Sequence, residues 1–599
     1  IVRVQGHIKG PGATLWQALK DSPVGRELGD DLPNLRISGT NTLDLDLTIP
    51  LPANTHANRI KGQVGLLENN MTLPGWNLEL SRLRGEVHFT EADLDAKDVQ
   101  MLLRDEPTRL DLDLIGRENR RALRTRLRGQ WGLRMLAGAQ TAALERYISG
   151  KSAWEAVLMV PTGRRERRGE TPPFTLDLSS ELRGTAIRLP APLGKSASEI
   201  RPIRINLRPR EHTALDITLD YGEKIRAALQ LTDFSRNPQL VRGELRINAG
   251  TAKLPDAPGL AVIAQLPRWE LTAFPTRSSP LSLREEKAFT DDPNPWHTLR
   301  SLDARIGTLL IGRQTFSEVS LNATRQEDGM RVELDGDTLA GRVIVPDQPS
   351  PEQPIRATLR RLYLHQALDS SPSIPKHADA STFDPRQLPP LLLTATDVQL
   401  NDAELGQLRL VTLPRPDGLH IAEFSLDSKQ QRIDAIGDWK WTTDGQASRM
   451  QATLHSRALG ETFTAFGYAE TGIARGETAA ELAVAWAAAL PDFALDRLEG
   501  TLKLQIGPGQ LLDVDPGVGR MVGVFNVQNL MRRLSLDFSD LFQSGMGFDH
   551  ISGTFTFKQG QAYTDNLTIE APAARIQIQG RAGLKERDYA QRITVTPKL

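Results

Sequence analysis

The chain has 599 residues, 73 of them basic and 74 acidic, and a formal net charge of −1. Because the charges balance, no overall field favours nucleic acid or an acidic substrate. The lack of cysteine excludes a disulfide framework, a zinc–thiolate site and a thiol nucleophile. A chain of this length normally divides into several domains.

Short runs of alternating apolar and polar residues follow one another along the whole chain. Clear examples are residues 43–49, 110–114, 215–220, 501–506 and 554–557. Because successive side chains of a strand point to opposite faces, each run has one apolar face and one polar face. The pattern is typical of a half-buried antiparallel sheet.

Glycine recurs at one place in these runs, after an apolar residue and a spacer and just before the alternating strand. Such a glycine often marks a β-bulge or a sharp bend. We therefore expect bends that curl the sheet at Gly85, Gly243, Gly500 and Gly553.

A longer repeat appears at an offset of 89 residues, where residues 316–332 match residues 405–421. Both copies contain a strand, a polar turn with Asp-Gly and a second strand, which predicts a β-hairpin. Repetition of this kind favours an array of units that stack on their neighbours.

Helical periodicity is rare, and its best example covers residues 516–533. The apolar residues with helical spacing there are Val518, Met521, Val522 and Phe525. We predict a helix near 516–533 that packs as a cap over the end of the sheet, with contact to a membrane or a partner as the alternative.

We divide the chain into three regions. Residues 1–300 are the first part of a repeated β-groove. Residues 301–470 contain repeated hairpin units with an irregular connection rich in Pro and Ser near 369–390. Residues 471–599 form the C-terminal end of the groove.

The residue types used in catalysis or metal binding do not occur in the sequence with the spacing of a known site. The ten histidines are scattered singly, and none has metal-ligand spacing with a second histidine. Paired carboxylates such as Asp44 with Asp46 could serve a glycosidase, but any solvated strand face contains such pairs. We predict no enzyme activity, no cofactor and no metal site.

The apolar faces need a cover that a few short helices cannot supply. A second sheet, a solenoid that closes on itself or an amphipathic ligand would each provide one. Only 5% of the residues are aromatic, so the faces are lined mainly by Leu, Ile and Val. Such walls suit acyl chains better than sugars or bases, which usually stack on aromatic rings.

Several motifs, concentrated after residue 380, resemble those of the YhdP proteins of the AsmA-like family. Residues 35–115 match the same proteins more loosely. The segments that carry the resemblance are 384–389, 405–410, 500–506, 509–520, 534–542, 547–549, 551–553, Gly560, 566–567 and 572–580.

The resemblance implies a bridge-like lipid transport protein in the envelope of Gram-negative bacteria. Its fold would be mainly β: a long, curled, mostly antiparallel sheet that forms an extended hydrophobic groove, with a few short helices. Its periplasmic body would carry phospholipids between the inner and outer membranes. An N-terminal anchor absent from this chain would hold it in the inner membrane, and its C-terminal end would meet the outer membrane or proteins there. The family implies no catalytic residues and no nucleic-acid partner.

Two other interpretations stay open. A structural β-solenoid scaffold of the cell envelope would seal its apolar face with protein and have no lipid conduit. A carbohydrate-active β-helix is disfavoured by the scarcity of aromatic residues.

Strand parity gives the residues expected to contact lipid. Within each strand, these residues share a face at a spacing of two. We expect Leu504→Asp to impair lipid movement more than folding, and charges at Lys503 or Gln505 to be tolerated. The predicted lipid-binding residues are Leu45, Leu47, Val87, Phe89, Leu245, Ile247, Leu502, Leu504, Phe555 and Phe557.

Overall fold

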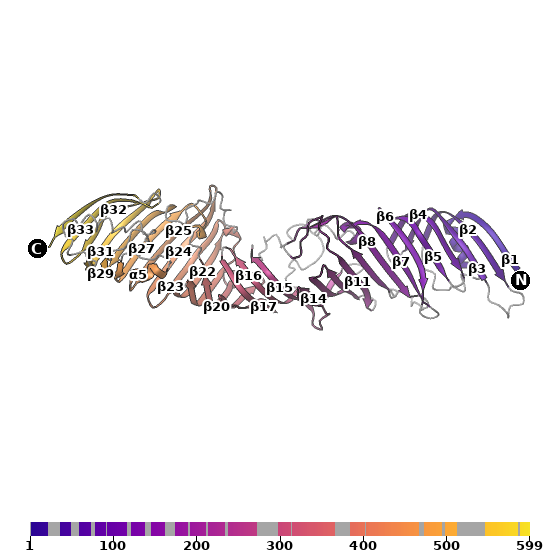
Figure 1. The fold of residues 1–599 in the computed structure, drawn as a ribbon, viewed down its shortest axis with the longest axis horizontal. Coiled ribbons are helices and arrows are strands. Elements are labelled where there is room, and N and C mark those ends of the chain that lie inside the picture. The colour runs from indigo at the N-terminus through magenta and orange to yellow at the C-terminus, as the bar shows by residue number, and fades with distance from the viewer. Residues whose placement is uncertain are drawn as a thin grey trace. The chain divides into compact units, whose positions relative to one another are not determined.

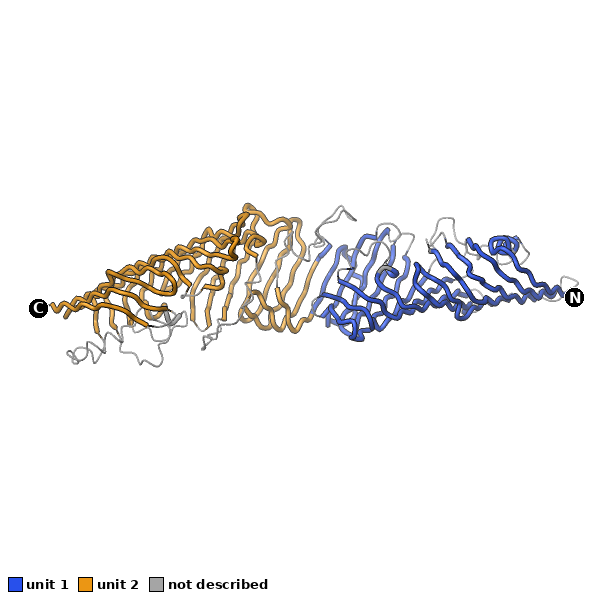
Figure 2. Tube along the Cα trace, turned by 90° about the horizontal axis from the view of Figure 1, so that it is seen from above, with its two compact units in different colours: residues 1–264, 288–300 blue, residues 265–287, 301–599 orange. Residues whose placement is uncertain are grey.

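The protein, described by a computed structural model, divides into two compact units (Figure 2). Unit 1 contains residues 1–264 and 288–300, and unit 2 contains residues 265–287 and 301–599. The structure describes residues 2–21, 36–49, 59–73, 78–90, 93–116, 121–137, 145, 147–161, 174–189, 192–210, 214–233, 238–271, 298–312, 314–365, 384–401, 403–465, 473–493, 497–511, 546–584 and 588–598.

Apart from β10, the strands of unit 1 lie beside one another in chain order (Figure 1). The last of them, β15, crosses from unit 1 into unit 2 at residue 264. The strands are β1 (Val2–Pro11), β2 (Arg36–Ile49), β3 (Arg59–Leu73), β4 (Leu78–Thr90), β5 (Leu94–Leu103), β6 (Glu106–Ile115), β7 (Ala122–Gly132), β8 (Ile148–Pro161), β9 (Thr175–Ser180), β10 (Thr185–Ile187), β11 (Ile203–Arg210), β12 (Ala214–Tyr221), β13 (Ile225–Thr232), β14 (Gln239–Ile247) and β15 (Gly259–Leu271).

The strand pairs of unit 1 are antiparallel, except that β14 and β15 run parallel. Strand β9 joins β8 to β11, and the short strand β10 pairs with the beginning of β8. Within the described residues of this unit there are two helices, α1 (Gly12–Asp21) and α3 (Leu133–Ala137).

Unit 2 continues the same plan in its main sheet, where β20 and β21 form a parallel pair among antiparallel ones. The strands of the main sheet are β16 (Leu299–Ile311), β17 (Gln314–Gln326), β18 (Gly329–Asp335), β19 (Leu339–Pro346), β20 (Ile355–Leu364), β21 (Leu391–Leu400), β22 (Ala403–Arg415), β23 (Gly418–Asp427), β24 (Gln431–Thr442), β25 (Gly445–Ser456), β27 (Thr478–Trp486), β28 (Glu499–Ile506), β31 (His550–Lys558), β32 (Gln561–Glu570), β33 (Ala574–Gly583) and β34 (Tyr589–Pro597).

A separate three-stranded sheet accompanies the main sheet of unit 2. It contains β26 (Ile473–Arg475), β29 (Gly509–Leu511) and β30 (Met546–Phe548). Only Gly507 and Pro508 separate β28 from β29, and Asp549 alone separates β30 from β31. Because proline cannot donate to a strand ladder, the pair Gly507–Pro508 ends β28 and lets the chain turn into the smaller sheet.

The helices in the described part of unit 2 are short. They are α5 (Leu459–Ala465) and two 3₁₀ turns, η6 (Pro385–Gln387) and η7 (Leu490–Asp492). The sequence-based fold class, a mainly β and mostly antiparallel sheet with few helices, is therefore confirmed. The predicted helix near 516–533 lies outside the described residues, and the division into three regions stays a prediction.

Both predicted hairpins are present. Strands β17 and β18 pair around residues 327–328, and β22 and β23 pair around residues 416–417. The repeated sequence therefore corresponds to a repeated structural unit, as the Asp-Gly turns predicted.

Shifts of strand register are found at or next to three of the four expected glycines. Gly85 has φ +150° and lies where the register between β4 and β5 shifts, so a β-carbon there would approach the Cα of Val99 to 3.1 Å. Gly553 lies within the shift between β31 and β32, and Gly243 lies next to a shift in β14. At Gly500, β28 keeps its register with both neighbours, so no bulge is present there, although its φ of +141° is a backbone conformation that favours glycine.

Candidate functional site

The strand register shows which side chains form one continuous surface, because residues paired across neighbouring strands point to the same face. In unit 2, one line of paired residues crosses every main-sheet strand from β16 to β31. We call it the central row of unit 2. All of its members are apolar: Leu302, Ala323, Val332, Val343, Ala357, Leu393, Leu410, Phe424, Ala435, Ala452, Leu482, Leu502 and Phe555.

The large side chains of this row remain partly exposed from its beginning to Leu502. Phe424, in the middle of the row, is one example. Phe555, the last member, is only 3% exposed. Burial of apolar surface is favourable, so an apolar ligand laid along the partly exposed members would be stabilised. The other buried members are the alanines Ala323, Ala357 and Ala435.

Unit 1 contains a similar line from β1 to β15, which we call the central row of unit 1. Thr125 and Gly243 are its two members without an apolar side chain. The row consists of Ile8, Leu43, Val64, Val87, Ala96, Leu112, Thr125, Leu158, Leu176, Leu207, Ile217, Leu229, Gly243 and Leu260.

The apolar face of unit 1 is more covered at one end of its strands than at the other. At the first end, Met135 of α3 packs against a cluster that includes Leu83, Val99 and Met101, which are 3%, 1% and 4% exposed. We call this end the covered margin. At the other end, side chains such as Phe89 remain partly exposed. A ligand on this face would therefore lie over the central row and the more exposed end.

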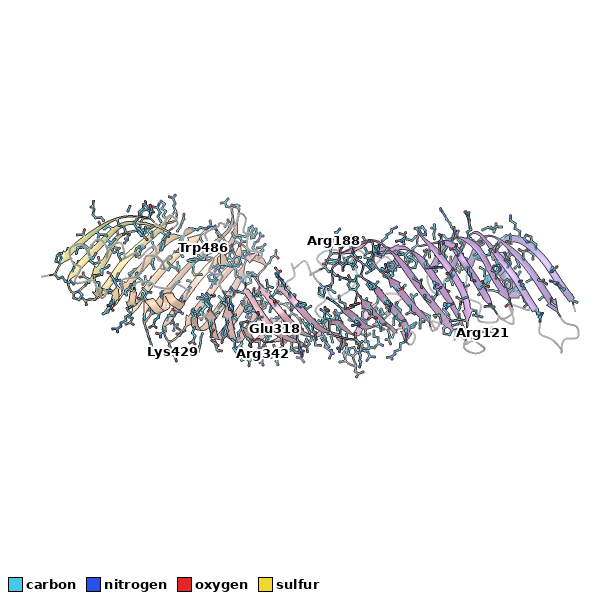
Figure 3. All side chains as sticks on the ribbon, viewed as in Figure 1. Arg121, Arg188, Glu318, Arg342, Lys429 and Trp486 are labelled. Atoms are coloured by element: carbon cyan, nitrogen blue, oxygen red, sulfur yellow. The ribbon has the colours of Figure 1, made fainter. Side chains whose placement is uncertain are left out.

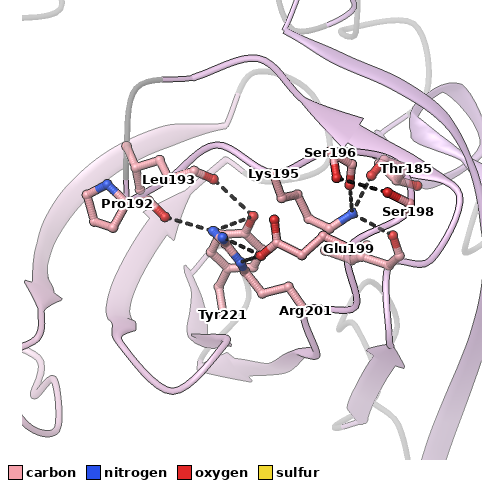
Figure 4. A network of polar contacts seen from close by, with 10 residues as sticks. Thr185, Pro192, Leu193, Lys195, Ser196, Ser198, Glu199, Arg201 and Tyr221 are labelled. Carbon is pink, nitrogen blue, oxygen red and sulfur yellow. Dashed lines mark hydrogen bonds and ion pairs between the residues drawn. The ribbon is translucent and has the colours of Figure 1, made fainter.

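The connection between β9 and β11 completes the covered margin and is held by a buried lysine (Figure 4). Lys195 is 6% exposed, and its Nζ donates to the carbonyl oxygens of Leu182 at 2.9 Å, Thr185 at 2.5 Å and Ser196 at 2.7 Å. Burial lowers the pKa of Lys195. Three carbonyl acceptors match the three N–H donors of an ammonium group, so the buried charge is fully hydrogen-bonded.

A second clamp in the same connection uses Arg201 (Figure 4). Its guanidinium lies 5.1 Å from the ring centroid of Tyr221, and its Nε donates to Glu199 Oε1 at 3.0 Å. Its Nη1 donates to the carbonyl oxygen of Pro192 at 2.7 Å and to the Tyr221 hydroxyl at 3.3 Å, and that hydroxyl donates to the Leu193 carbonyl oxygen at 2.9 Å. The connection is thus fixed to the end of β12.

The six lipid-binding residues predicted in unit 1 lie on the face of its central row. The row passes through their strands at Leu43, Val87 and Gly243. Val87 is itself a member of the row, and each of the other five residues lies two or four positions further along its strand, which places it on the same face. Five of the six are partly exposed, but Ile247 is 8% exposed at the covered margin. The six are Leu45, Leu47, Val87, Phe89, Leu245 and Ile247.

The four residues predicted in unit 2 also share one face, but protein covers most of it. Leu504, Phe555 and Phe557 are 4%, 3% and 5% exposed, whereas Leu502 is partly exposed. They belong to a cluster that we call the closed core. Trp486, labelled in Figure 3, is another member. The three-stranded sheet and α5 supply Ile473, Leu511, Met546, Phe548 and Leu459 to this cluster.

The opposite face of both units is polar and bonded by ion pairs. Arg124 Nη2 lies 2.6 Å from Asp113 Oδ2, and Arg409 Nε lies 2.9 Å from Glu423 Oε1. Side-chain hydrogen bonding to Asp113 raises the pKa of Arg124. Among the described residues, this face therefore offers paired charges and no continuous apolar surface.

A cleft of about 1340 Å³ in unit 1 is lined by residues from β3 to β11, many of which are charged. Its charged side chains mostly neutralise one another. Arg84 lies 2.6 Å from Glu68, and Lys151 lies 2.7 Å from Glu106. A lining of paired charges does not suit an acyl chain, because desolvating charged groups is costly.

Strand parity selected the apolar faces, but it missed most members of the central rows, such as Leu410 and Leu482. The alternating pattern around them was visible in the sequence. Their alignment across strands depends on register, which hairpin turns and bulges set. Within the part of the chain that the structure describes, no group of three or more His, Cys, Asp or Glu side chains could hold a metal ion.

The comparison with protein families decides the relationship. A family model with the description "YhdP protein" matches residues 1–599. The chain belongs to the YhdP family. It is similar to the Intermembrane phospholipid transporter YhdP of Escherichia coli (strain K12), with 23% identity over 608 residues, which cover 100% of this chain and 46% of that YhdP protein. The chain thus spans less than half the length of this relative.

No solved structure matches the chain. Among the helices of the described ranges, none is long and apolar enough to cross a membrane.

Proposed function

We propose that the chain is part of a bridge-like transporter and carries phospholipids along its apolar face. The observation that carries the proposal is the central row of unit 2, which is apolar at every strand and partly exposed at its large side chains up to Leu502. The relative named as an intermembrane phospholipid transporter supports the choice of ligand.

The energetics of an acyl chain fit such a row. Each buried methylene contributes about 0.8 kcal/mol, so a chain of about 16 carbons in water is destabilised by about 12 kcal/mol. A continuous apolar row removes most of that penalty while offering little advantage over a bilayer. Lipid can therefore move from site to site without being trapped.

The same proposal places the chain in the periplasm. The full protein would be anchored in the inner membrane. It would deliver lipid at the outer membrane or to proteins there. Polar side chains on the opposite face, such as Arg409 with Glu423, would keep that face in contact with water.

Site-specific photo-crosslinking tests the proposal. p-Benzoylphenylalanine would replace Phe424 and Leu482 of the central row and, as matched controls, their neighbours Ser425 and Ala483 on the opposite face. After irradiation with vesicles of phosphatidylethanolamine, mass spectrometry should find lipid adducts at the two central positions and none at the controls. Equal labelling of both sets, or no labelling of a folded protein, would contradict the proposal and favour a sealed structural scaffold.

A further inference from the structure

The motif from Asp384 to Pro389 forms an anchored turn at one end of the apolar face in unit 2. The Asp384 carboxylate caps η6 by accepting from the backbone N–H of Arg386 at 3.0 Å. Pro385 is buried, and Leu388 packs against Leu419 and Trp439 on β23 and β24. The turn is thus fixed to the strand ends beside the central row.

This turn holds an arginine side chain in a defined orientation. Nε of Arg386 lies 2.9 Å from Asp384 Oδ1, and Nη2 lies 2.7 Å from Asp384 Oδ2. The guanidinium carbon lies 4.8 Å from the ring centroid of Trp441. Hydrogen bonding to Arg386 lowers the pKa of Asp384, so the carboxylate stays ionised and the pair persists.

The group remains accessible to a ligand. The Arg386 side chain is 45% exposed, and Trp441 is 40% exposed. Among the described residues, no hydrogen bond engages Nη1 of Arg386. An arginine presents five N–H donors in a fixed fork, so the edge that includes Nη1 is free to bind a phosphate in two-point fashion.

Arg201 of unit 1 is an internal comparison for this geometry. It also pairs with an acid two residues earlier and lies over an aromatic ring at a strand end. There Nη1 is occupied by Pro192 and Tyr221, and the side chain is only 21% exposed. Arg201 is a closed structural clamp, whereas Arg386 has the same support and an unused edge.

The position of Arg386 matches the length of a lipid. Trp439 and Trp441 stand four and six positions beyond Ala435 of the central row on β24. At about 3.3 Å per residue, these steps span roughly 13 to 20 Å. Half of a bilayer's hydrocarbon core measures roughly 15 Å. Acyl chains lying on the central row would therefore bring a phosphate near Arg386.

We propose that Arg386, held by Asp384 over Trp441, binds the phosphate diester of a phospholipid whose acyl chains lie on the central row of unit 2. This inference rests on the proposed function and adds a headgroup site to it. The pre-oriented guanidinium needs little reorganisation on binding, so little side-chain entropy is lost when the phosphate binds.

Two photoactivatable phosphatidylethanolamine probes test the inference, one with a diazirine in the acyl chain and one with a diazirine on the headgroup. Wild type and Arg386→Met would be irradiated with vesicles containing each probe. We expect headgroup labelling near residues 384–389 to fall at least about tenfold in the variant, because charge-assisted hydrogen bonds to the phosphate are lost. Acyl labelling near Phe424 should persist. Arg409→Met, which removes a surface arginine of β22, should leave both signals unchanged.

The outcomes separate the two proposals. Unchanged headgroup labelling in Arg386→Met, with acyl labelling present, overturns the headgroup site alone. Absence of acyl labelling in the wild type overturns the proposed function and the headgroup site with it. If Arg386→Met has a lower melting temperature than the wild type, Arg386→Lys is used instead. Lysine keeps the positive charge and the aliphatic part of the side chain but lacks the forked guanidinium donors. Partial loss of headgroup labelling is then expected, and full retention would contradict the inference.

Discussion

The closed core and the central row of unit 2 have the same kind of sequence on the same face of the sheet, yet only one is covered. Phe555 and Phe424 both belong to the central row. Phe555 is 3% exposed under the three-stranded sheet, whereas Phe424 is partly exposed. Alternation of apolar and polar residues therefore shows which face is apolar, but it does not show what covers that face.

The largest expected effect comes from a charge in the closed core. Leu504→Asp should destabilise unit 2 by about 5 kcal/mol, because a carboxylate would be buried among apolar side chains without a partner. This reverses the expectation drawn from strand parity, which ignored the packing around Leu504. Chemical denaturation would measure the change, with Lys503→Asp on the exposed face as the control. An unchanged denaturation midpoint in Leu504→Asp would show that this core opens to water.

Truncation of two phenylalanines compares the two regions directly. Phe555→Ala should lower the free energy of unfolding by about 4 kcal/mol, because it leaves a cavity in a packed cluster. Phe424→Ala should lower it by about 1 kcal/mol, because a partly exposed side chain buries less surface. Thermal unfolding in the absence of lipid would measure both. Equal losses would mean that the central row is packed like a core.

The covered margin of unit 1 provides a smaller effect. Lys195→Met should destabilise the connection between β9 and β11 by about 2 kcal/mol, because three buried carbonyl oxygens lose their donor. Hydrogen exchange of residues 182–201 would report the change. Lys151→Met is the control, because Lys151 is 57% exposed in an ion pair with Glu106 and should change stability by less than about 1 kcal/mol. Unaltered exchange in Lys195→Met would show that the clamp at Arg201 suffices.

The smallest change in stability is expected on the polar face, and it should appear mainly when the pH is lowered. Hydrogen bonds from Arg3 and Gln5 lower the pKa of Asp46 from its ordinary 3.8 to about 2. Between about pH 4 and about pH 2, the unfolded state therefore binds more protons than the folded state. The stabilising contribution is complete above the unfolded pKa and is lost as the pH falls through the folded pKa.

NMR titration of the Asp46 carboxyl and amide exchange in β1 would follow this loss. Asp46→Asn should remove the acid-induced increase of amide exchange in β1. A carboxyl that titrates near its ordinary value would show that the pairing with Arg3 and Gln5 does not persist in solution.

The sequence allowed the fold class, the apolar faces and the repeated hairpins to be predicted, because all three depend on local patterns. The period of two identified Leu502 and Leu504 as one face, and the Asp-Gly turns located the hairpins. The cover over Leu504 could not be predicted, because it comes from β26, β29 and β30, which the chain brings back from distant positions. The sequence showed Arg386 only as part of the motif 384–389. Its contact with the ring of Trp441 could not be predicted, because Trp441 is 55 positions later in the sequence.

The two parallel strand pairs bear on how the protein folds. An antiparallel hairpin forms from neighbouring residues, so most strands can add to the growing sheet through contacts of short sequence separation. Among the described pairs, β14 with β15 and β20 with β21 are parallel. Each needs a connection that runs from the end of the first strand back to the edge of the sheet where that strand began. The longer of these covers residues 365–390 and carries η6, so its closure entropy is the larger. Each unit can thus be assembled mostly by short steps however many strands it contains, and we expect assembly to slow at the long connections, which include residues 507–549 between the antiparallel strands β28 and β31.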